Sequence, residues 1–258
     1  MDTQLFGSGS VALQEEINRA FISAMSRVYL WMTGGLVLTT VVAMVVALNP
    51  EVQEAVFSNG LIVFGLIGAQ IGLVLLISVT INKLSPATAL GLFFLFAGMM
   101  GMTLSVIFVV YDLGTIGLAF AATASIFTGL SIAGLTTKRD LTSLGPILFA
   151  SLFGLILASF ANVFFQSTAL EWLVSFAGVI IFMGLTVYDS KKIKEMTSEA
   201  VMQGDTLAVS RIGAIGALKL YLDLINLFIF ILSIVGNRKQ QVTLRLHPQW
   251  TPSEARPN

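Results

Sequence analysis

Long apolar segments almost free of charged residues restrict the fold of this chain more than any other feature. A helix needs about 20 apolar residues to cross the ~30 Å hydrocarbon core of a bilayer. Six charge-free runs of about that length occur, at Val28–Leu48, Gly60–Ile81, Ala87–Val110, Gly114–Leu135, Leu144–Ala161 and Trp172–Tyr188. A seventh run, Ile212–Val235, is apolar except for Lys219, Asp223 and Asn226. The pattern predicts an all-α, polytopic membrane bundle of seven transmembrane helices.

Composition excludes the other broad classes of protein. Hydrophobic residues make up 56% of the chain and charged residues only 11%, whereas soluble domains are about 25% charged. The net charge is zero and there is no cysteine, which argues against a nucleic-acid-binding protein and a disulfide-stapled secreted one. The one histidine, His247, follows the last apolar run. We therefore expect no nucleic-acid partner and no tightly bound cofactor or metal.

Positively charged residues predict the orientation of the bundle. Nine lysines and arginines precede the first run or follow the second, fourth and sixth: Arg19, Arg27, Lys83, Lys138, Arg139, Lys191, Lys192, Lys194 and Arg211. The loops at residues 49–59, 111–113 and 162–171 contain none. Because basic loops stay in the cytoplasm, the N-terminus is predicted to be cytoplasmic.

Three regions follow along the chain. Residues 1–27 are predicted to form a cytoplasmic arm, residues 28–236 the transmembrane domain, and residues 237–258 a polar, flexible tail. The seventh run leaves two alternatives open, because crossing fully would place Arg238 and Lys239 outside. It either crosses against the charge rule or enters the membrane and turns back. The glycine pairs Gly68/Gly72 and Gly98/Gly101 indicate tight helix packing within the bundle.

Two carboxylates stand out, because a charge at the bilayer centre costs about 2.5–3.5 kcal/mol on insertion scales. Asp189 ends the sixth run, and Asp223 lies within the seventh with Asn226 on the same helical face. Purely structural interpretations exist for both. Asp189 could be a solvated helix end neutralised by the lysines that follow it, and Asp223 could pair with Lys219 on its own helix.

A functional interpretation brings the two aspartates together near the cytoplasmic face. Two carboxylates at hydrogen-bond distance in a low dielectric do not both ionise easily, so they would share one proton. Loss of that proton would create repulsion between the sixth and seventh helices. The two anions would then offer hard oxygen ligands suited to transient calcium binding.

These residues resemble the Bax inhibitor-1 (transmembrane Bax inhibitor motif) family. The resemblance rests on residues Leu220–Phe228 together with the Tyr188–Asp189 pair. Weaker similarity lies in Phe96–Leu104 and Arg27–Gly35, and the whole covers roughly residues 20–238.

The resemblance implies a seventh helix enclosed by the other six and a pH-sensitive calcium leak gated by a proton shared between Asp189 and Asp223. Tyr188 and Asn226 would support this pair. In some relatives a basic cluster after the second span interacts with the aspartates, and Lys83 is the residue available for that role here. Lys219 lies outside the motif, where it could compete for Asp223. Small size, short loops and a minimal N-terminal arm indicate a bacterial inner membrane, or else an organellar one. The expected partners are the lipid bilayer, calcium and protons, and the resemblance adds a membrane protease.

Alternatives from other classes remain. The chain could be a non-conducting regulator of a membrane protease or of a stress or cell-death complex, with structural aspartates. It could be a proton-coupled transporter, although inverted repeats are not evident. It could be an intramembrane aspartyl protease, although Leu220–Leu222 stands where those enzymes have Gly-x-Gly before the second aspartate.

Overall fold

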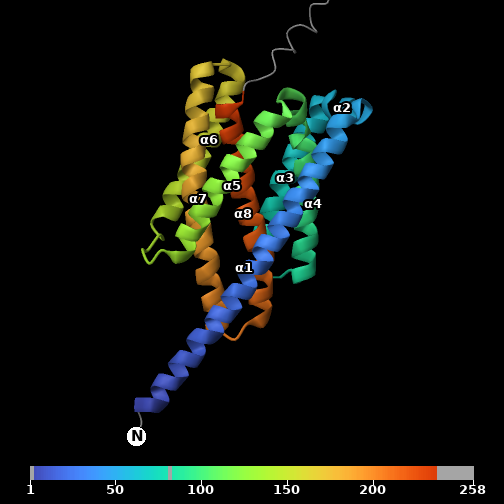
Figure 1. The fold of residues 1–258 in the computed structure, drawn as a ribbon. Helices are drawn as coiled ribbons and strands as arrows, with labels where there is room; N and C mark the ends of the chain where they lie inside the picture. Colours follow the sequence, from blue (N-terminus) through green and yellow to red (C-terminus); the bar gives the residue numbers. More distant parts are fainter. Residues whose placement is uncertain (1–2, 81–82, 237–258) are drawn as a thin grey trace, which may run out of the picture.

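The computed structural model describes residues 3–80 and 83–236, with side chains from residue 14 onward except at position 206. Within these ranges the chain forms eight helices and no strand (Figure 1): α1 (Thr3–Leu48), α2 (Pro50–Phe57), α3 (Gly60–Thr80), α4 (Pro86–Val110), α5 (Leu113–Thr136), α6 (Leu144–Phe165), α7 (Thr168–Met202) and α8 (Thr206–Val235). The predicted tail at 237–258 and the predicted end of the second span at Ile81 lie outside the described residues.

Among the described residues, seven helices are long and apolar enough to cross a membrane, as the sequence predicts. Only α2 is not, since it has eight residues. Asn49 caps α2 by accepting a hydrogen bond from the Val52 backbone N–H, and Pro50 occupies the first turn, where a missing N–H has no cost. The short helix therefore serves as the connection between α1 and α3.

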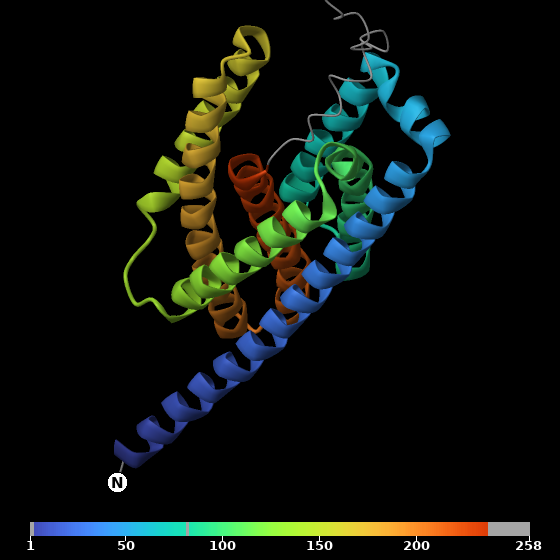
Figure 2. The same ribbon diagram turned by 45° about the horizontal axis from the view of Figure 1, so that its top comes forward.

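Helix α1 is one uninterrupted element of 46 residues, about 69 Å long at 1.5 Å per residue. Its N-terminal end projects well beyond the rest of the bundle in both views (Figures 1 and 2). No break marks the predicted boundary at Val28, and Ala24 and Met25 are already buried. Packing against the bundle thus begins before the charge-free run does.

Helices α7 and α8 also extend beyond their charge-free runs. The α7 helix continues through Asp189 to Met202, so Asp189 lies inside a helix rather than at its end. The α8 helix runs without a break from Thr206 to Val235, and its apolar length is sufficient to span the bilayer. The alternative in which this segment enters and turns back is therefore wrong.

Helix α8 is the innermost of the spanning helices (Figures 1 and 2), and its apolar window has the largest buried share of the seven. It packs against α1, α4, α5 and α7. Tyr221 anchors it: its ring meets Phe93 and Phe96 edge-on, and its hydroxyl lies 2.7 Å from Thr39 Oγ1. Because Thr39 already donates to the Ala97 carbonyl, the Tyr221 hydroxyl must be the donor to Thr39. One buried hydroxyl chain thus ties α8, α1 and α4 together.

Close helix contacts occur at only some of the glycines. A Cβ at Gly101 would lie 2.6 Å from the Thr39 carbonyl oxygen, and one at Gly134 would lie 2.4 Å from that of Val187. These two glycines let α4 approach α1 and α5 approach α7. Gly68, Gly72 and Gly98 have nothing within 4 Å of such a Cβ. The expectation that the Gly68/Gly72 pair packs tightly within the bundle is therefore wrong, because this face of α3 meets no neighbouring helix.

Candidate functional site

Asp189 of α7 and Lys219 of α8 form an ion pair between helices. Lys219 Nζ donates to Asp189 Oδ1 at 2.7 Å. The aspartate is 6% exposed, and the lysine side chain is 31% exposed. Lys219 therefore bonds to the carboxylate on the neighbouring helix, and not to Asp223 as in the purely structural alternative.

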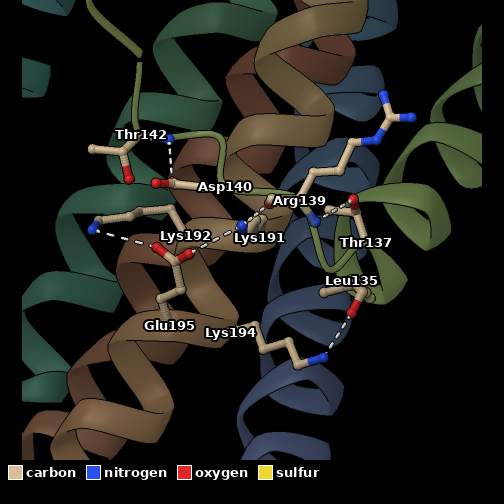
Figure 3. Close-up of polar contacts among 9 residues, drawn as sticks. All are labelled: Leu135, Thr137, Arg139, Asp140, Thr142, Lys191, Lys192, Lys194 and Glu195. Atoms are coloured by element: carbon tan, nitrogen blue, oxygen red, sulfur yellow. Dashed lines mark hydrogen bonds and ion pairs between the residues drawn. The ribbon is translucent and has the colours of Figure 1, made fainter. Parts of the chain in front are cut away.

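The lysines that follow Asp189 have other partners. In Figure 3, Lys191 and Lys192 contact Glu195, and Lys194 Nζ donates to the Leu135 carbonyl at 2.9 Å. Lys191 also donates to the Arg139 carbonyl. The bond to Arg139 joins the loop between α5 and α6 to α7, and the bond to Leu135 joins the end of α5 to α7. None of these three lysines contacts Asp189, whose ion-pair partner is Lys219.

The same loop contains an aspartate of its own. Asp140 accepts a hydrogen bond from the Thr142 backbone N–H at 2.9 Å (Figure 3). Hydrogen bonds from the Thr142 side chain and backbone hold the pKa of Asp140 below its ordinary value, as expected for a carboxylate that accepts hydrogen bonds in its charged form. Asp140 therefore stabilises the local turn.

Asp223 lies one turn beyond Lys219 on α8 and is 4% exposed. Its Oδ2 atom is buried and has no hydrogen-bond partner among the described residues. A buried polar atom without a partner costs free energy, about 1–3 kcal/mol or more for a charged group. Such an atom marks a place that favours a proton, a cation or a hydrogen-bond donor.

Asp189, Lys219 and Asp223 line one cavity of about 820 Å³, which we term the lateral cavity. Its remaining walls come from α3, α4, α6, α7 and α8, and most of its lining is apolar. It lies beside α8, with α3 lining one side and α6 the other. The structure thus brings the two predicted aspartates to one space inside the bundle.

Two side-chain amides add to the polar wall of the lateral cavity. Asn226, predicted from the sequence, donates its side-chain N–H to the Leu222 carbonyl at 2.8 Å. Gln70 of α3 donates to the Met99 carbonyl at 2.9 Å and to Thr103 Oγ1 at 2.7 Å. Sequence analysis missed Gln70, although a single amide inside an otherwise apolar span was a usable signal.

Two predicted supporting residues lie elsewhere. The Tyr188 ring packs against Gly145 at the start of α6, beside Leu141 and Lys192, and does not line the lateral cavity. Lys83 is exposed in the turn between α3 and α4, and no described residue forms an ion pair with it. In place of Lys83, it is Lys219 whose side chain contacts one of the aspartates.

A second cavity of about 590 Å³ adjoins the first and opens near the loop between α6 and α7. The two share Ser159, Val163 and Phe230. The second cavity is more polar, with lining residues that include Asn162, Gln166, Thr168, Glu171, Ser175 and Ser233. Together the two cavities extend from the end of the bundle to the buried carboxylates.

A resident metal centre is not apparent. Among the side chains that the structure describes, no three histidines or acidic residues gather closely enough to hold an ion. Two carboxylates and two amides provide fewer than the six to eight oxygens that calcium takes, so water would complete its shell.

Comparison with known proteins identifies the family of the chain. The model of the family described as "Inhibitor of apoptosis-promoting Bax1" matches residues 20–240. The inner membrane protein YbhL of Escherichia coli K12 is 46% identical over 215 residues, covering 83% of this chain and 92% of that protein. A protein of Borreliella burgdorferi is 41% identical over 215 residues, with the same coverage. A Rickettsia prowazekii protein is 35% identical over 217 residues, covering 83% of this chain and 89% of that one.

Fold and site together define an integral, multi-pass membrane protein with two buried carboxylates lining a cavity in a seven-span helix bundle. The chain belongs to the Bax inhibitor-1 family, as its sequence motifs indicate.

Proposed function

We propose that this protein is a pH-sensitive calcium leak channel in which Asp189 and Asp223 control passage by sharing a proton. The supporting observation is that both buried carboxylates line one cavity, which adjoins a polar cavity reaching the end of the bundle. Intramembrane carboxylates that face an internal space are typical of ion and proton pathways.

Charge in the lateral cavity depends on a single proton. With Lys219 charged and both aspartates ionised the three groups carry one net negative charge, and protonation of one aspartate makes them neutral. A hydrated cation is attracted to the first state and not to the second. Calcium flux should therefore rise as the pH rises.

Lys219 acts in this proposal as a tethered cation that occupies the site when calcium is absent. Its ammonium holds Asp189 Oδ1 at 2.7 Å, so an entering calcium ion must compete with it for that oxygen. With 31% of the lysine side chain exposed, it can leave at a smaller desolvation cost than a fully buried group.

Apolar packing closes the path beyond the ion pair. Ile193, one turn past Asp189 on α7, is completely buried. A Cβ at Gly216 of α8 would lie 2.7 Å from Val28 Cγ2 and 3.1 Å from Ile193 Cδ1. This Val28–Gly216–Ile193 layer joins α1, α8 and α7, and separation of the helices would open it.

The proposal is tested by measuring calcium flux into liposomes that contain the pure protein. The pH is varied from about 5 to about 9, a range that brackets the pKa of a perturbed carboxylate. Asp223→Asn should abolish most of the flux, and Asp189→Asn should remove its pH dependence. Asp112→Asn is the matched control, because Asp112 caps α5 at the surface and asparagine caps equally well.

Two results would overturn the proposal. An unchanged pH profile in folded Asp189→Asn protein would eliminate the shared proton. No flux at any pH from folded wild-type protein would eliminate the channel and favour the non-conducting regulator of a protease or stress complex. We further propose a bacterial inner membrane location with a cytoplasmic N-terminus. The charge bias of the loops supports the orientation, and the name of the E. coli relative, an inner membrane protein, supports the location.

A further inference from the structure

The lateral cavity has the size of a small-molecule site. Its volume of about 820 Å³ lies within the roughly 300–1,000 Å³ of typical ligand pockets. Its lining is mainly apolar with a few convergent polar groups, which is also typical of such sites.

The rim of the cavity consists of apolar side chains that face outward from the bundle. Ile71 and Leu75 of α3 form one edge, and Ile156, Phe160 and Val163 of α6 form the other. All five are more than half exposed although they line the cavity. In a spanning bundle such side chains face lipid, so the cavity opens sideways to the bilayer between α3 and α6.

The polar floor of the cavity offers mainly hydrogen-bond acceptors. Gln70 and Asn226 use their amide N–H groups on backbone carbonyls, which leaves their oxygens free to accept. Lys219 is engaged by Asp189, and Asp223 Oδ2 is buried without a partner. A ligand that satisfies this floor must bring donors, and a positive charge would balance the remaining carboxylate.

We propose that the lateral cavity binds a single-tailed amphiphile with a primary ammonium head group, which enters from the bilayer between α3 and α6. The ammonium donates to Asp223 and to the amide oxygens, and the tail lies along the apolar walls toward the rim. This inference goes beyond the calcium leak and does not require that the protein conducts.

The volume selects this occupant over larger ones. At about 30 Å³ per heavy atom, close to the share of a water molecule in the liquid, 820 Å³ holds roughly 27 atoms. That suits one tail with its head group, whereas the second tail of a phospholipid would have to stay outside the cavity in the bilayer. A spanning helix about 10 Å across and 30 Å long occupies roughly 2,400 Å³, so a partner helix does not fit either.

Binding of three probes with the same tail tests the proposal: tetradecylamine, tetradecanol and tetradecanoic acid. The full-length protein is placed in nanodiscs of phosphatidylcholine, so that the bilayer itself offers no primary ammonium. Radiolabelled probe is measured at neutral pH as the saturable excess over empty nanodiscs. We expect the amine to bind at least about tenfold more tightly than the alcohol, or about 1.4 kcal/mol, and the acid to bind more weakly than the amine.

Two variants separate the head-group site from the tail site. Asp223→Asn should reduce the preference for the amine to within about twofold of the alcohol. Ile156→Trp should fill the cavity and weaken both probes. Ile132→Trp is the control, because Ile132 on α5 is 56% exposed, as Ile156 is, and does not line the cavity.

Equal binding of amine and alcohol by the wild-type protein would overturn the proposal, as would tighter binding of the acid. An amine preference that survives in Asp223→Asn, or wild-type binding by Ile156→Trp, would also overturn it. Calcium flux takes no part in these measurements, so their failure is distinct from failure of the channel.

Discussion

Lys219 Nζ lies 2.7 Å from Asp189 Oδ1 on the preceding helix, whereas Asp223, one turn along the same helix as Lys219, has a buried carboxylate oxygen with no partner. Two carboxylates and one ammonium therefore line the same cavity, and only one of the carboxylates is paired with the ammonium. Removing the ammonium should leave both carboxylates without a cation.

Removal of the ammonium in Lys219→Met should destabilise the protein by about 1–3 kcal/mol. This is less than the 3–5 kcal/mol of a fully buried pair, because part of the lysine is exposed. Protonation of a carboxylate relieves the uncompensated charge, so the loss should be larger at pH 8 than at pH 5. Denaturation of the purified protein at both pH values measures it.

Two comparisons complete that experiment. Lys192→Met removes only a contact with Glu195 between half-exposed groups, and should change stability by less than about 0.5 kcal/mol. The double change Lys219→Met with Asp189→Asn should recover part of the loss, since it removes the stranded charge. Wild-type stability of Lys219→Met at pH 8 would mean that the Lys219–Asp189 pair contributes nothing to the free energy of unfolding.

Glycines at close contacts should respond differently from glycines at open positions. Gly134→Ala would place a Cβ 2.4 Å from the Val187 carbonyl oxygen, so α5 and α7 must separate at a cost of about 1–3 kcal/mol. Gly72→Ala meets nothing within 4 Å and should be neutral or stabilise α3 by up to about 1 kcal/mol. Equal destabilisation by both would contradict the packing described here. Unfolding midpoints of the two variants provide the measurement.

The apolar layer beyond the ion pair should act as a barrier to calcium. Ile193→Ala removes a completely buried side chain from this layer and should raise the flux several-fold at every pH. It should also destabilise the protein by about 2–5 kcal/mol. Ile231→Ala is the matched control, because Ile231 is buried on α8 and lines neither cavity. An equal rise in both variants would point to general loosening instead of a barrier.

The orientation can be checked directly, because the chain contains no cysteine that would need to be removed. Single cysteines at Ser8 and Gln53 should react with a membrane-impermeant maleimide from opposite sides of the membrane, with Ser8 protected in intact cells. Reaction of both positions from the same side would show that the charge bias does not set the orientation.

The number of spans and the buried aspartates could be predicted from hydropathy, because lipid requires apolar side chains over a fixed length. The ends of the helices could not. Hydropathy marks where the chain leaves the membrane, and nothing in the charged segment after Asp189 breaks a helix, so α7 continues to Met202.

Side-chain contacts between different helices also could not be predicted from the sequence. The register of α7 against α8 decides that Lys219 reaches Asp189, and a pattern on one helix contains no information about that register. The Gly68/Gly72 spacing led to a contact being predicted where none exists, since this motif is typical of helix packing but no helix approaches it here. Tyr188 was misplaced for the same reason: its neighbour Asp189 points into the cavity, while its own ring faces Gly145.

The central position of α8 also bears on how the protein is made. With Lys219, Asp223 and Asn226 on one helix, α8 alone in lipid would be costly, because each charged group adds about 2.5–3.5 kcal/mol. It is also the seventh in chain order of the seven spans among the described residues, so the other six have left the ribosome before it emerges. The order of synthesis thus allows the six earlier spans to assemble first. The α8 helix can then insert among them, with its polar side chains facing protein instead of bulk lipid.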